Sequence, residues 1–280
     1  MTFRMDLDFD GFDKCDKSMK FGKAGKLGKF ARGFAPLVAL ALAGMTSGCD
    51  GSKVSINGEE GKPLSELDLS GAAPTELVLM GPDEVRITPG DKLAINVEGD
   101  AEAAEAMRFV LKDGALAVLR EGRFSNKADG TAIVNVTMPA PTELVLLGSG
   151  TINAAGMASA AKVVVTGSGT IETPSLSSES LDLVIGGSGS HRAAGNVAKL
   201  DMMIGGSGSA RFDALKVERA KVTLAGSGDA TFASDGEVEA TIMGSGEVRV
   251  RGRARCKVSA MGSGKLVCET APETATSDPA

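Results

Sequence analysis

One three-residue sequence, Gly-Ser-Gly, occurs seven times in the second half of the chain, and its period constrains the fold more than any other feature. Successive copies begin 18 to 20 residues apart. A period of this length is typical of solenoids, in which each repeat is one coil that buries its apolar side only by stacking on its neighbours. The glycines of the seven copies are Gly148, Gly150, Gly167, Gly169, Gly187, Gly189, Gly206, Gly208, Gly226, Gly228, Gly244, Gly246, Gly262 and Gly264.

Apolar residues alternate with other residues on both sides of each Gly-Ser-Gly, which indicates strands. The positions two and four before the first glycine, and two and four after the second, are almost wholly apolar. Side chains two apart on a strand share one face, so these columns line the inside of a coil. We therefore predict an all-β chain that forms a right-handed parallel β-helix, with about 18–20 residues per coil. A left-handed hexapeptide helix would need an aliphatic residue every six positions, and the columns do not show one.

The glycines of the repeat are interpreted as structural turns. A corner repeated in every coil needs positive φ or a close approach of two backbones, and glycine supplies both without steric cost. A calcium-binding nonapeptide roll is excluded because the corners lack its aspartate and the period is twice nine. A phosphate-binding loop is excluded because no Lys-Ser/Thr pair follows. We expect no cofactor and no metal at these corners.

Residues 64–140 show the same β-like pattern without the regular period. Residues 73–81 closely match 140–148, so that Gly81 occupies the place of a first corner glycine with Pro82 in the place of serine. We interpret 64–140 as irregular opening coils and an N-terminal β cap, and 141–269 as the regular repeats. An independent small β domain is the alternative. The predicted strands of this region are 64–69, 76–80, 84–88, 93–97, 107–111, 116–120 and 131–137.

The first forty-nine residues are interpreted as a signal peptide of lipoprotein type. Basic residues precede the apolar run 34–45, which is too short for a comfortable transmembrane helix. Small residues then precede Cys49, as in the lipobox of bacterial lipoproteins, and Cys49 is the predicted lipidation site. Ordinary secretion is the alternative. Since 1–18 is acidic and long, we predict that translation starts at Met19. Residues 50–63 are polar and are expected to be a tether.

The chain contains four cysteines, and two of them, Cys256 and Cys268, fall in the last coil. In an oxidising compartment such a pair is expected to form a disulfide. The bond would lock the end of the β-helix. After Glu269 the polar segment 270–280 is predicted to be a disordered tail.

The composition excludes several classes of function. The chain has no tryptophan, no tyrosine and a net charge of −6, whereas nucleic-acid-binding proteins combine basic patches with stacking aromatics. Its single histidine, His191, has no catalytic partners in sequence. This residue falls in an inward column, so it is either a satisfied core histidine or a residue that the strand turns outward.

Three outward columns remain as candidate surfaces. The column five before each corner is charged, with mostly alternating sign, and is interpreted as a device for solubility and register. The column three residues before each corner begins with four apolar residues and suggests an interacting or covered surface. We expect the N-terminal strands to pack over this column. A strip of six arginines is a candidate for anionic glycans or lipid head groups, or else a solvated face. The three sets are Glu143, Lys162, Asp182, Asp201, Lys221, Glu239 and Lys257; Val145, Val164, Val184, Met203, Thr223, Thr241 and Ser259; and Arg192, Arg211, Arg249, Arg251, Arg253 and Arg255.

The sequence Thr-Glu-Leu-Val-Leu-Leu-Gly-Ser-Gly-Thr-Ile from Thr142, the train of Gly-Ser-Gly corners and the exported N-terminus resemble the bacterial "putative auto-transporter adhesin, head GIN domain" family over 64–269. The resemblance implies a non-catalytic β-helical protein of the cell surface or the periplasm. Together with the predicted lipidation at Cys49, it leads us to expect an exported envelope protein that is lipid-anchored to the inner or outer membrane facing the periplasm, or is displayed at the cell surface. Its expected partners are a membrane, through the anchor, and polysaccharide or an envelope protein. The alternative is a carbohydrate-active enzyme, a lyase or hydrolase, since such enzymes share this architecture. The outward columns offer no aromatic platform for sugar stacking, which favours the binding protein.

Overall fold

The computed structural model describes residues 55–56, 59–121 and 130–269. The chain divides into two compact units, Met1–Glu60 and Gly61–Ala280. In the first unit the described strands β1 (Ser55–Ile56) and β2 (Glu59–Glu60) pair in antiparallel fashion, within the segment expected to be a tether. The predicted signal peptide, the start at Met19, the lipidation site Cys49 and the tail 270–280 lie outside the described residues.

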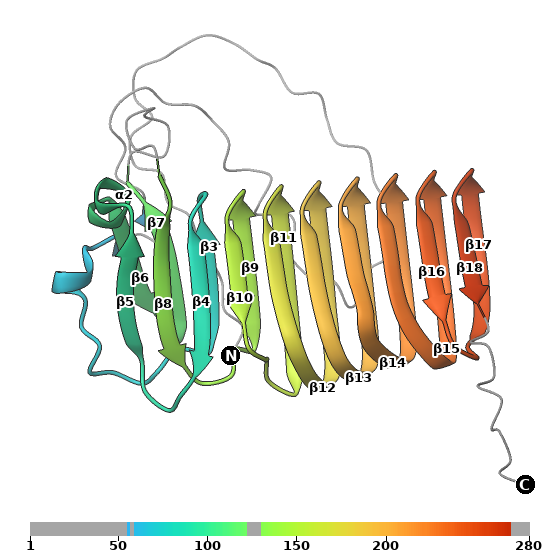
Figure 1. Cartoon of the computed structure of the whole chain (residues 1–280), viewed down its shortest axis with the longest axis horizontal. Coiled ribbons are helices and arrows are strands. Elements are labelled where there is room, and N and C mark those ends of the chain that lie inside the picture. The colour runs from blue at the N-terminus through green and yellow to red at the C-terminus, as the bar shows by residue number, and fades with distance from the viewer. Residues whose placement is uncertain (1–54, 57–58, 122–129, 270–280) are drawn as a thin grey trace, which may run out of the picture. The chain divides into compact units, whose positions relative to one another are not determined.

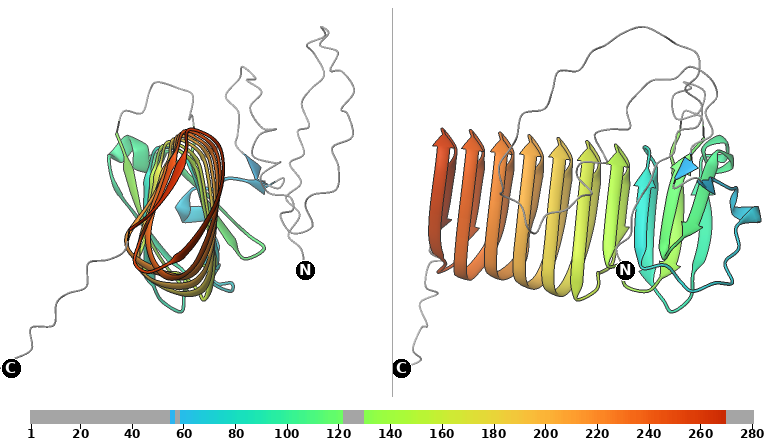
Figure 2. Two further views of the ribbon diagram at one scale, coloured as in Figure 1. Left: turned by 90° about the vertical axis from the view of Figure 1, so that its right-hand side faces the viewer. Right: turned by 180° about the vertical axis from the view of Figure 1, so that it is seen from behind.

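The second unit is a parallel β-helix of about seven turns, as the repeat period predicted (Figure 1). The descending strands, such as β16 (Glu247–Arg251) and β18 (Lys265–Glu269), lie toward the viewer in Figure 1, and the ascending strands lie behind them. Since the coils advance from left to right in that view, the helix is right-handed. Figure 2 shows the ascending layer from behind and the coils in end view.

The regular coils stack with their corners in register. Gly148 pairs with Gly167, which pairs with Gly187, and this ladder continues to Gly262. In the middle of the stack, single long strands bend through the second turn of each coil. The strands of this part are β9 (Glu143–Gly148), β10 (Thr151–Ala154), β11 (Ala160–Gly167), β12 (Thr170–Gly187), β13 (Ser190–Gly206), β14 (Ser209–Gly226), β15 (Asp229–Gly244), β16, β17 (Arg255–Gly262) and β18.

The N-terminal part continues this sheet but not in chain order. Its two outermost parallel strands, β7 and β8, pair with β3 and β4, which in turn pair with β9 and β10. Strands β5 and β6 then add antiparallel edges to β8 and β7. The elements are η1 (Leu64–Glu66), β3 (Glu76–Met80), β4 (Glu84–Pro89), β5 (Ala94–Gly99), α2 (Ala101–Glu105), β6 (Met107–Lys112), β7 (Ala115–Arg120) and β8 (Ala132–Met138).

The strand predicted at 64–69 is wrong. This segment forms the short 3-10 helix η1 and then an irregular stretch that ends before β3. Leu64, Leu67 and Leu69 are partly buried against the core. These leucines are therefore apolar because they pack against the core, and their spacing does not reflect the alternation of a strand.

The inward columns of the repeats form one continuous hydrophobic core together with the N-terminal strands. Its largest fully buried side chains include Phe109 of β6, Phe212 of β14 and Phe232 of β15. All four inward columns are buried through the coil that ends at Gly244, which confirms the orientation inferred from alternation. In the last coil, which no further described strand covers, Val258, Ala260 and Cys268 are exposed and Leu266 is half-buried.

The last coil carries the predicted disulfide. Cys256 of β17 and Cys268 of β18 are bonded, with their Cα atoms 6.7 Å apart. The bond joins the ascending and descending strands of the same coil. It therefore restrains two strands that each pair with a described strand on one side only.

Candidate functional site

The Gly-Ser-Gly corners are built from backbone packed against backbone. The first glycine of each corner has φ between +103° and +130°. The second lies so close to the coil below that a Cβ atom on Gly246 would stand 2.2 Å from the carbonyl oxygen of Gly228. The backbone N–H of Ser227 donates to the carbonyl oxygen of Gly206 at 2.9 Å, and equivalent serines repeat this bond along the stack. The corners are therefore scaffold.

His191 is a core residue, so of the two alternatives the inward one holds. The ring is fully buried, its Nε2 lies 2.9 Å from Thr173 Oγ1, and its edge contacts Phe212 with the ring centroids 5.0 Å apart. Burial lowers the pKa of His191 to about 3, so the ring is neutral at ordinary pH. Its Nδ1 has no hydrogen-bond partner among the described residues. Nor do these residues contain a group of three or more His, Cys, Asp or Glu side chains that could hold a metal ion.

The strip of six arginines is largely neutralised by carboxylates. Five of the six lie within 4.0 Å of an acidic side chain, and all of these pairs are solvent-exposed. Exposed pairs of this kind stabilise little, but they cancel the local positive charge. The pairs are Arg192 with Glu172, Arg249 with Glu247 and Glu269, Arg251 with Asp213, Arg253 with Asp235, and Arg255 with Glu237.

The charged outward column behaves as a ladder of stacked side chains. Lys162 Nζ lies 2.9 Å from Glu143 Oε1 on the coil below. The predicted like-charge step brings Asp182 beside Asp201, and partial desolvation together with the Asp201 carboxylate raises the pKa of Asp182. Lys199 relieves this step through an ion pair with Asp201 at 2.5 Å. The ladder thus works by cancellation of charge and offers no isolated reactive group.

The apolar outward column is not covered by the N-terminal strands, so that prediction is wrong. Val78 of β3 pairs with Val145, and Ala117 of β7 pairs with Val78, so these strands lengthen the column. The register of the repeats simply continues into β3 and β7. Val145 is half-buried by its neighbours on the sheet, whereas Met203 is exposed.

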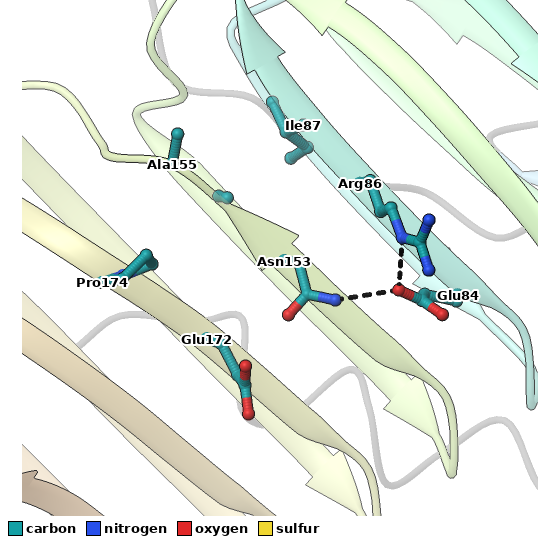
Figure 3. A pocket seen from close by; sticks show the side chains of 8 residues that line it. Glu84, Arg86, Ile87, Asn153, Ala155, Glu172 and Pro174 are labelled. Carbon is teal, nitrogen blue, oxygen red and sulfur yellow. Dashed lines mark hydrogen bonds and ion pairs between the residues drawn. The ribbon is translucent and has the colours of Figure 1, made fainter.

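A groove opens on the descending layer where the N-terminal part meets the repeats (Figure 3). We call it the junction groove, and it has a volume of about 440 Å³. Its polar side chains come from β4, β10 and β12, and its apolar ones flank them. The lining residues are Glu84, Arg86, Ile87, Asn153, Ala154, Ala155, Glu172 and Pro174.

Glu84 organises the polar side of the junction groove. Its Oε1 accepts hydrogen bonds from Arg86 Nε at 2.6 Å and from Asn153 Nδ2 at 3.0 Å. Glu172 accepts a hydrogen bond from Arg192 Nη1 at 2.9 Å. Within the described part of the chain, these bonds leave the Nη groups of Arg86, the carbonyl oxygen of Asn153 and the second oxygen of Glu84 available to a ligand. The groove thus offers donors and acceptors side by side.

The groove exists because the chain leaves the regular coil at this point. Strand β10 ends at Ala154, and residues 155–159 form no strand, whereas β12 runs on through its bend. The side chains that border this gap, Ala154, Ala155 and Pro174, are small and leave the depression unfilled. A smaller cavity of about 80 Å³ shares Ile87 and Ala155 with it.

A buried ion pair closes the N-terminal part and was not found from the sequence. Asp83 is fully buried and stands where the repeats have their second corner glycine. Arg120 Nε donates to Asp83 Oδ2 at 3.0 Å, Arg120 Nη2 contacts Oδ1, and the backbone N–H of Ala132 donates to Oδ1 at 2.9 Å. Arg120 Nη2 also donates to the carbonyl oxygen of Gly130 at 3.1 Å. The pair links β7 to the start of β8 and is a structural plug.

The junction groove was missed as well, although a signal was present. Arg86, Asn153 and Glu172 occupy the same outward column as Arg192, Arg211 and Arg249, because β4, β10, β12 and β13 are in register. The match between 73–81 and 140–148 extends the repeat to Gly81. Continuing the column across Pro82 and Asp83 would have brought these residues together.

The chain is therefore a β-helical protein, and the candidate binding sites among its described residues lie on the outer surface of the coils. The sequence profile of the family described as "putative auto-transporter adhesin, head GIN domain" matches residues 73–254. The chain belongs to this family. No curated protein matches it.

Solved structures of bacterial proteins share the fold. A "putative adhesin" from Bacteroides fragilis superposes with a TM-score of 0.63 at 16% identity, over 70% of this chain and 92% of its own. A "putative lipid binding protein" from Parabacteroides distasonis gives 0.55 at 19% identity, over 70% and 93%. A "putative adhesin" from Parabacteroides merdae gives 0.52 at 20% identity, over 70% and 92%. At these identities the likeness establishes the fold.

The membership indicates an exported or cell-surface bacterial protein. In the described ranges, no helix has both the length and the apolar character needed to cross a membrane.

Proposed function

We propose that this protein is a non-catalytic adhesin of the bacterial envelope that is anchored through Cys49 and binds glycan chains on its outward faces. The junction groove carries this proposal, because it combines a network of donors and acceptors with a small apolar wall. Each sugar hydroxyl both donates and accepts hydrogen bonds, so neighbouring hydroxyls need donors and acceptors side by side. The Arg86, Glu84 and Asn153 side chains provide that arrangement.

The charges around the groove favour a neutral sugar over an acidic one. Two guanidinium groups, Arg86 and Arg192, are offset by the carboxylates of Glu84 and Glu172, and the Glu98 carboxylate also acts on Arg86, so no excess positive charge remains. Five of the six arginines of the strip are paired with carboxylates in the same way. A polyanion would have to displace these carboxylates before it gained any ion pair, and that exchange offers little net free energy.

The binding test uses purified protein and a panel of neutral and acidic polysaccharides, with both affinity and turnover measured. We expect binding to a neutral polymer without turnover. Arg86→Gln should weaken it about tenfold, since a hydrogen bond to a charged group contributes about 1.5–3 kcal/mol. The control is Arg249→Gln, because Arg249 lies in the same outward column outside the groove and pairs with Glu247 two residues earlier at 2.7 Å, as Arg86 pairs with Glu84 at 2.6 Å; Arg249 also pairs with Glu269 at 2.9 Å.

Three results would contradict the proposed function. Equal losses in the two variants would remove the groove from the binding site. A preference for acidic polymers would show that the charge argument is wrong. Turnover of any polymer would make the protein a carbohydrate-active enzyme.

The proposed anchor has its own test. The protein expressed in bacteria with a labelled fatty acid should incorporate the label and sediment with the envelope. Cys49→Ser should abolish both, and Cys15→Ser should leave both unchanged because Cys15 precedes the predicted cleavage point. Secretion of unlabelled wild-type protein would contradict anchoring without affecting the groove.

A further inference from the structure

The C-terminal coil of the β-helix ends in two unpaired strand edges. Strand β17 pairs only with β15, and β18 pairs only with β16, among the residues that the structure describes. These are the last strands of the ascending and descending layers (Figures 1 and 2). Unpaired edges of this kind present a row of backbone N–H and C=O groups that another strand can bind.

The same coil exposes side chains that every earlier regular coil buries. Val258 is 51% exposed, whereas Ala240, its neighbour in the same inward column, is 0% exposed. Ala260 is likewise exposed above the buried Ile242, and Met261 is 67% exposed on the outer face. A solenoid end with apolar inward side chains requires a cap or a partner to remain in water.

The charges of this coil do not protect its edges, because the preceding coil already pairs with them. Arg255 pairs with Glu237 at 3.2 Å, and Lys265 pairs with Glu247 at 2.9 Å. Glu269 pairs with Arg249 at 2.9 Å. Charged side chains on an edge normally oppose edge-to-edge association, and here they are largely neutralised.

The disulfide prepares both edges for a single partner. Cys256 lies on β17 and Cys268 on β18, so the bond fixes the ascending and descending edges relative to each other. A partner that pairs with one edge therefore finds the other already in place. Such preorganisation lowers the entropy lost on binding.

We propose that the open C-terminal end, formed by β17 and β18, binds the same end of a second copy of the chain. The two copies then form a dimer with two-fold symmetry. A two-fold axis through the middle of both edges sets β18 antiparallel to β18 of the partner subunit, and β17 likewise. The full overlap of β18 centres on Val267 and brings Lys265 opposite Glu269 of the partner subunit. The disulfide sets Cys256 level with Cys268, so the same axis passes close to Lys257 of β17. Arg255 then faces Ser259 of the partner subunit, and the two copies of Lys257 lie near each other, each with Glu239 of its own chain in register beside it. On β18 no like charges meet in this register.

The tail of the same chain is a poorer occupant. Residues 270–280 contain only alanine and proline as apolar residues, with prolines at 272 and 279. They cannot supply the large apolar side chains that Val258 and its neighbours would bury, and proline interrupts a ladder of backbone hydrogen bonds. A second copy supplies both the apolar surface and a complete edge.

The dimer would place the two junction grooves toward opposite ends of the assembly, since each groove lies near the N-terminal end of its own stack. Two linked sites increase the overall affinity for a polymer without any new contact. This consequence rests on the proposed function, whereas the dimer itself does not.

The test measures the mass of the purified full chain by sedimentation over a wide range of concentrations. Wild type should pass from monomer to dimer. Lys265→Glu and Glu269→Lys should each weaken association about tenfold, because each places like charges across the interface twice. The double variant Lys265→Glu/Glu269→Lys should restore association. The matched control, Lys221→Glu/Glu239→Lys, exchanges a pair that lies in register on β14 and β15 and should not affect it.

The double variant separates an interface from a local structural effect. Within one chain the two substitutions set a carboxylate beside Glu247 and an ammonium group beside Arg249, so a purely structural role predicts the weakest association in the double variant. That result would overturn the proposal. A wild-type protein that stays monomeric at every concentration would overturn it too. If amides of β17 and β18 were protected from hydrogen exchange in that monomer, and lost protection on removal of 270–280, the tail would be the occupant.

Discussion

The two ends of this β-helix are finished in opposite ways. At the N-terminal end, the antiparallel strands β5 and β6 flank the last parallel strands, and Phe109 and Met107 of β6 are buried. At the C-terminal end the repeat simply stops, and inward residues such as Val258 are exposed. The N-terminal end is thus closed by a change of strand direction, and the C-terminal end is held by a covalent bond.

This difference shows what a repeat can and cannot specify. A Gly-Ser-Gly corner stacks equally well on the coil below and beneath the coil above, so nothing in it ends the stack. The N-terminal end abandons the corner, and Asp83 replaces a glycine so that its carboxylate meets Arg120. Variants at the two ends should therefore differ in both size and kind of effect.

The largest effect is expected at the closed end. Asp83→Ala removes the carboxylate that binds the buried guanidinium of Arg120 and the backbone N–H of Ala132. Breaking a buried pair in this way costs about 3–5 kcal/mol of the free energy of unfolding. Denaturant unfolding measures the loss. If Asp83→Ala unfolds like wild type, the plug does not hold the N-terminal end.

Loss of the disulfide should be the next largest effect, and it should be local. Cys256→Ser with Cys268→Ser opens a crosslink between residues twelve apart, which by the loop-entropy relation lowers stability by about 2–3 kcal/mol. Hydrogen exchange should speed up in β17 and β18 and stay unchanged in β3 and β7. Faster exchange that spread equally to both ends would show that the stack unfolds as one unit.

The third prediction concerns His191 of β13, which lies in the middle of the stack, away from both ends. His191 has a pKa of about 3 in the folded chain, because it is buried, against about 6.5 when unfolded. The unfolded chain therefore takes up the proton first as the pH falls, and wild type should lose about 2 kcal/mol of stability between pH 7 and pH 5 from this residue. His191→Leu should lack this component.

Denaturant unfolding of wild type and His191→Leu at a series of pH values provides the measurement. The difference between the two proteins should grow as the pH falls below 6.5. Parallel pH profiles would mean that His191 is hydrated or paired in solution. Carboxylates contribute equally to both profiles and cancel in the difference.

The smallest effect is expected from exposed pairs at the open end. Asp235→Ala removes a carboxylate that pairs with the Arg253 side chain, which is 81% exposed, and that accepts a hydrogen bond from the backbone N–H of Arg253 at 3.0 Å, also on the exposed surface. Water already screens this pair, so the unfolding midpoint should stay within experimental error of wild type. A loss comparable to that of Asp83→Ala would show that water does not screen this pair.

The regular stack could be predicted from the sequence because its information is local and repeated. Alternation around each Gly-Ser-Gly assigned the inward columns, and it placed Cys256 and Cys268 in the same coil. The N-terminal end could not be predicted in the same way. Strands β7 and β8 follow β4 in the chain but lie beyond it in the sheet, and no corner sequence marks that reversal of order.

The candidate site depended on contacts that local patterns do not report. Asp83 and Arg120 are thirty-seven residues apart, and neither has a repeat equivalent. Glu84 and Asn153 meet only because β4 pairs with β10. The junction groove also needs the chain to leave the coil after Ala154, which is a departure from the period and not part of it.

The contrast between the two ends is tested most directly by hydrogen exchange of wild type at low and high protein concentration. The account predicts slow exchange in β3 and β7 at both concentrations. In β17 and β18 it predicts fast exchange at low concentration and slow exchange at high concentration, as the open ends pair. Fast exchange of β17 and β18 at all concentrations, or slow exchange at all of them, would contradict it.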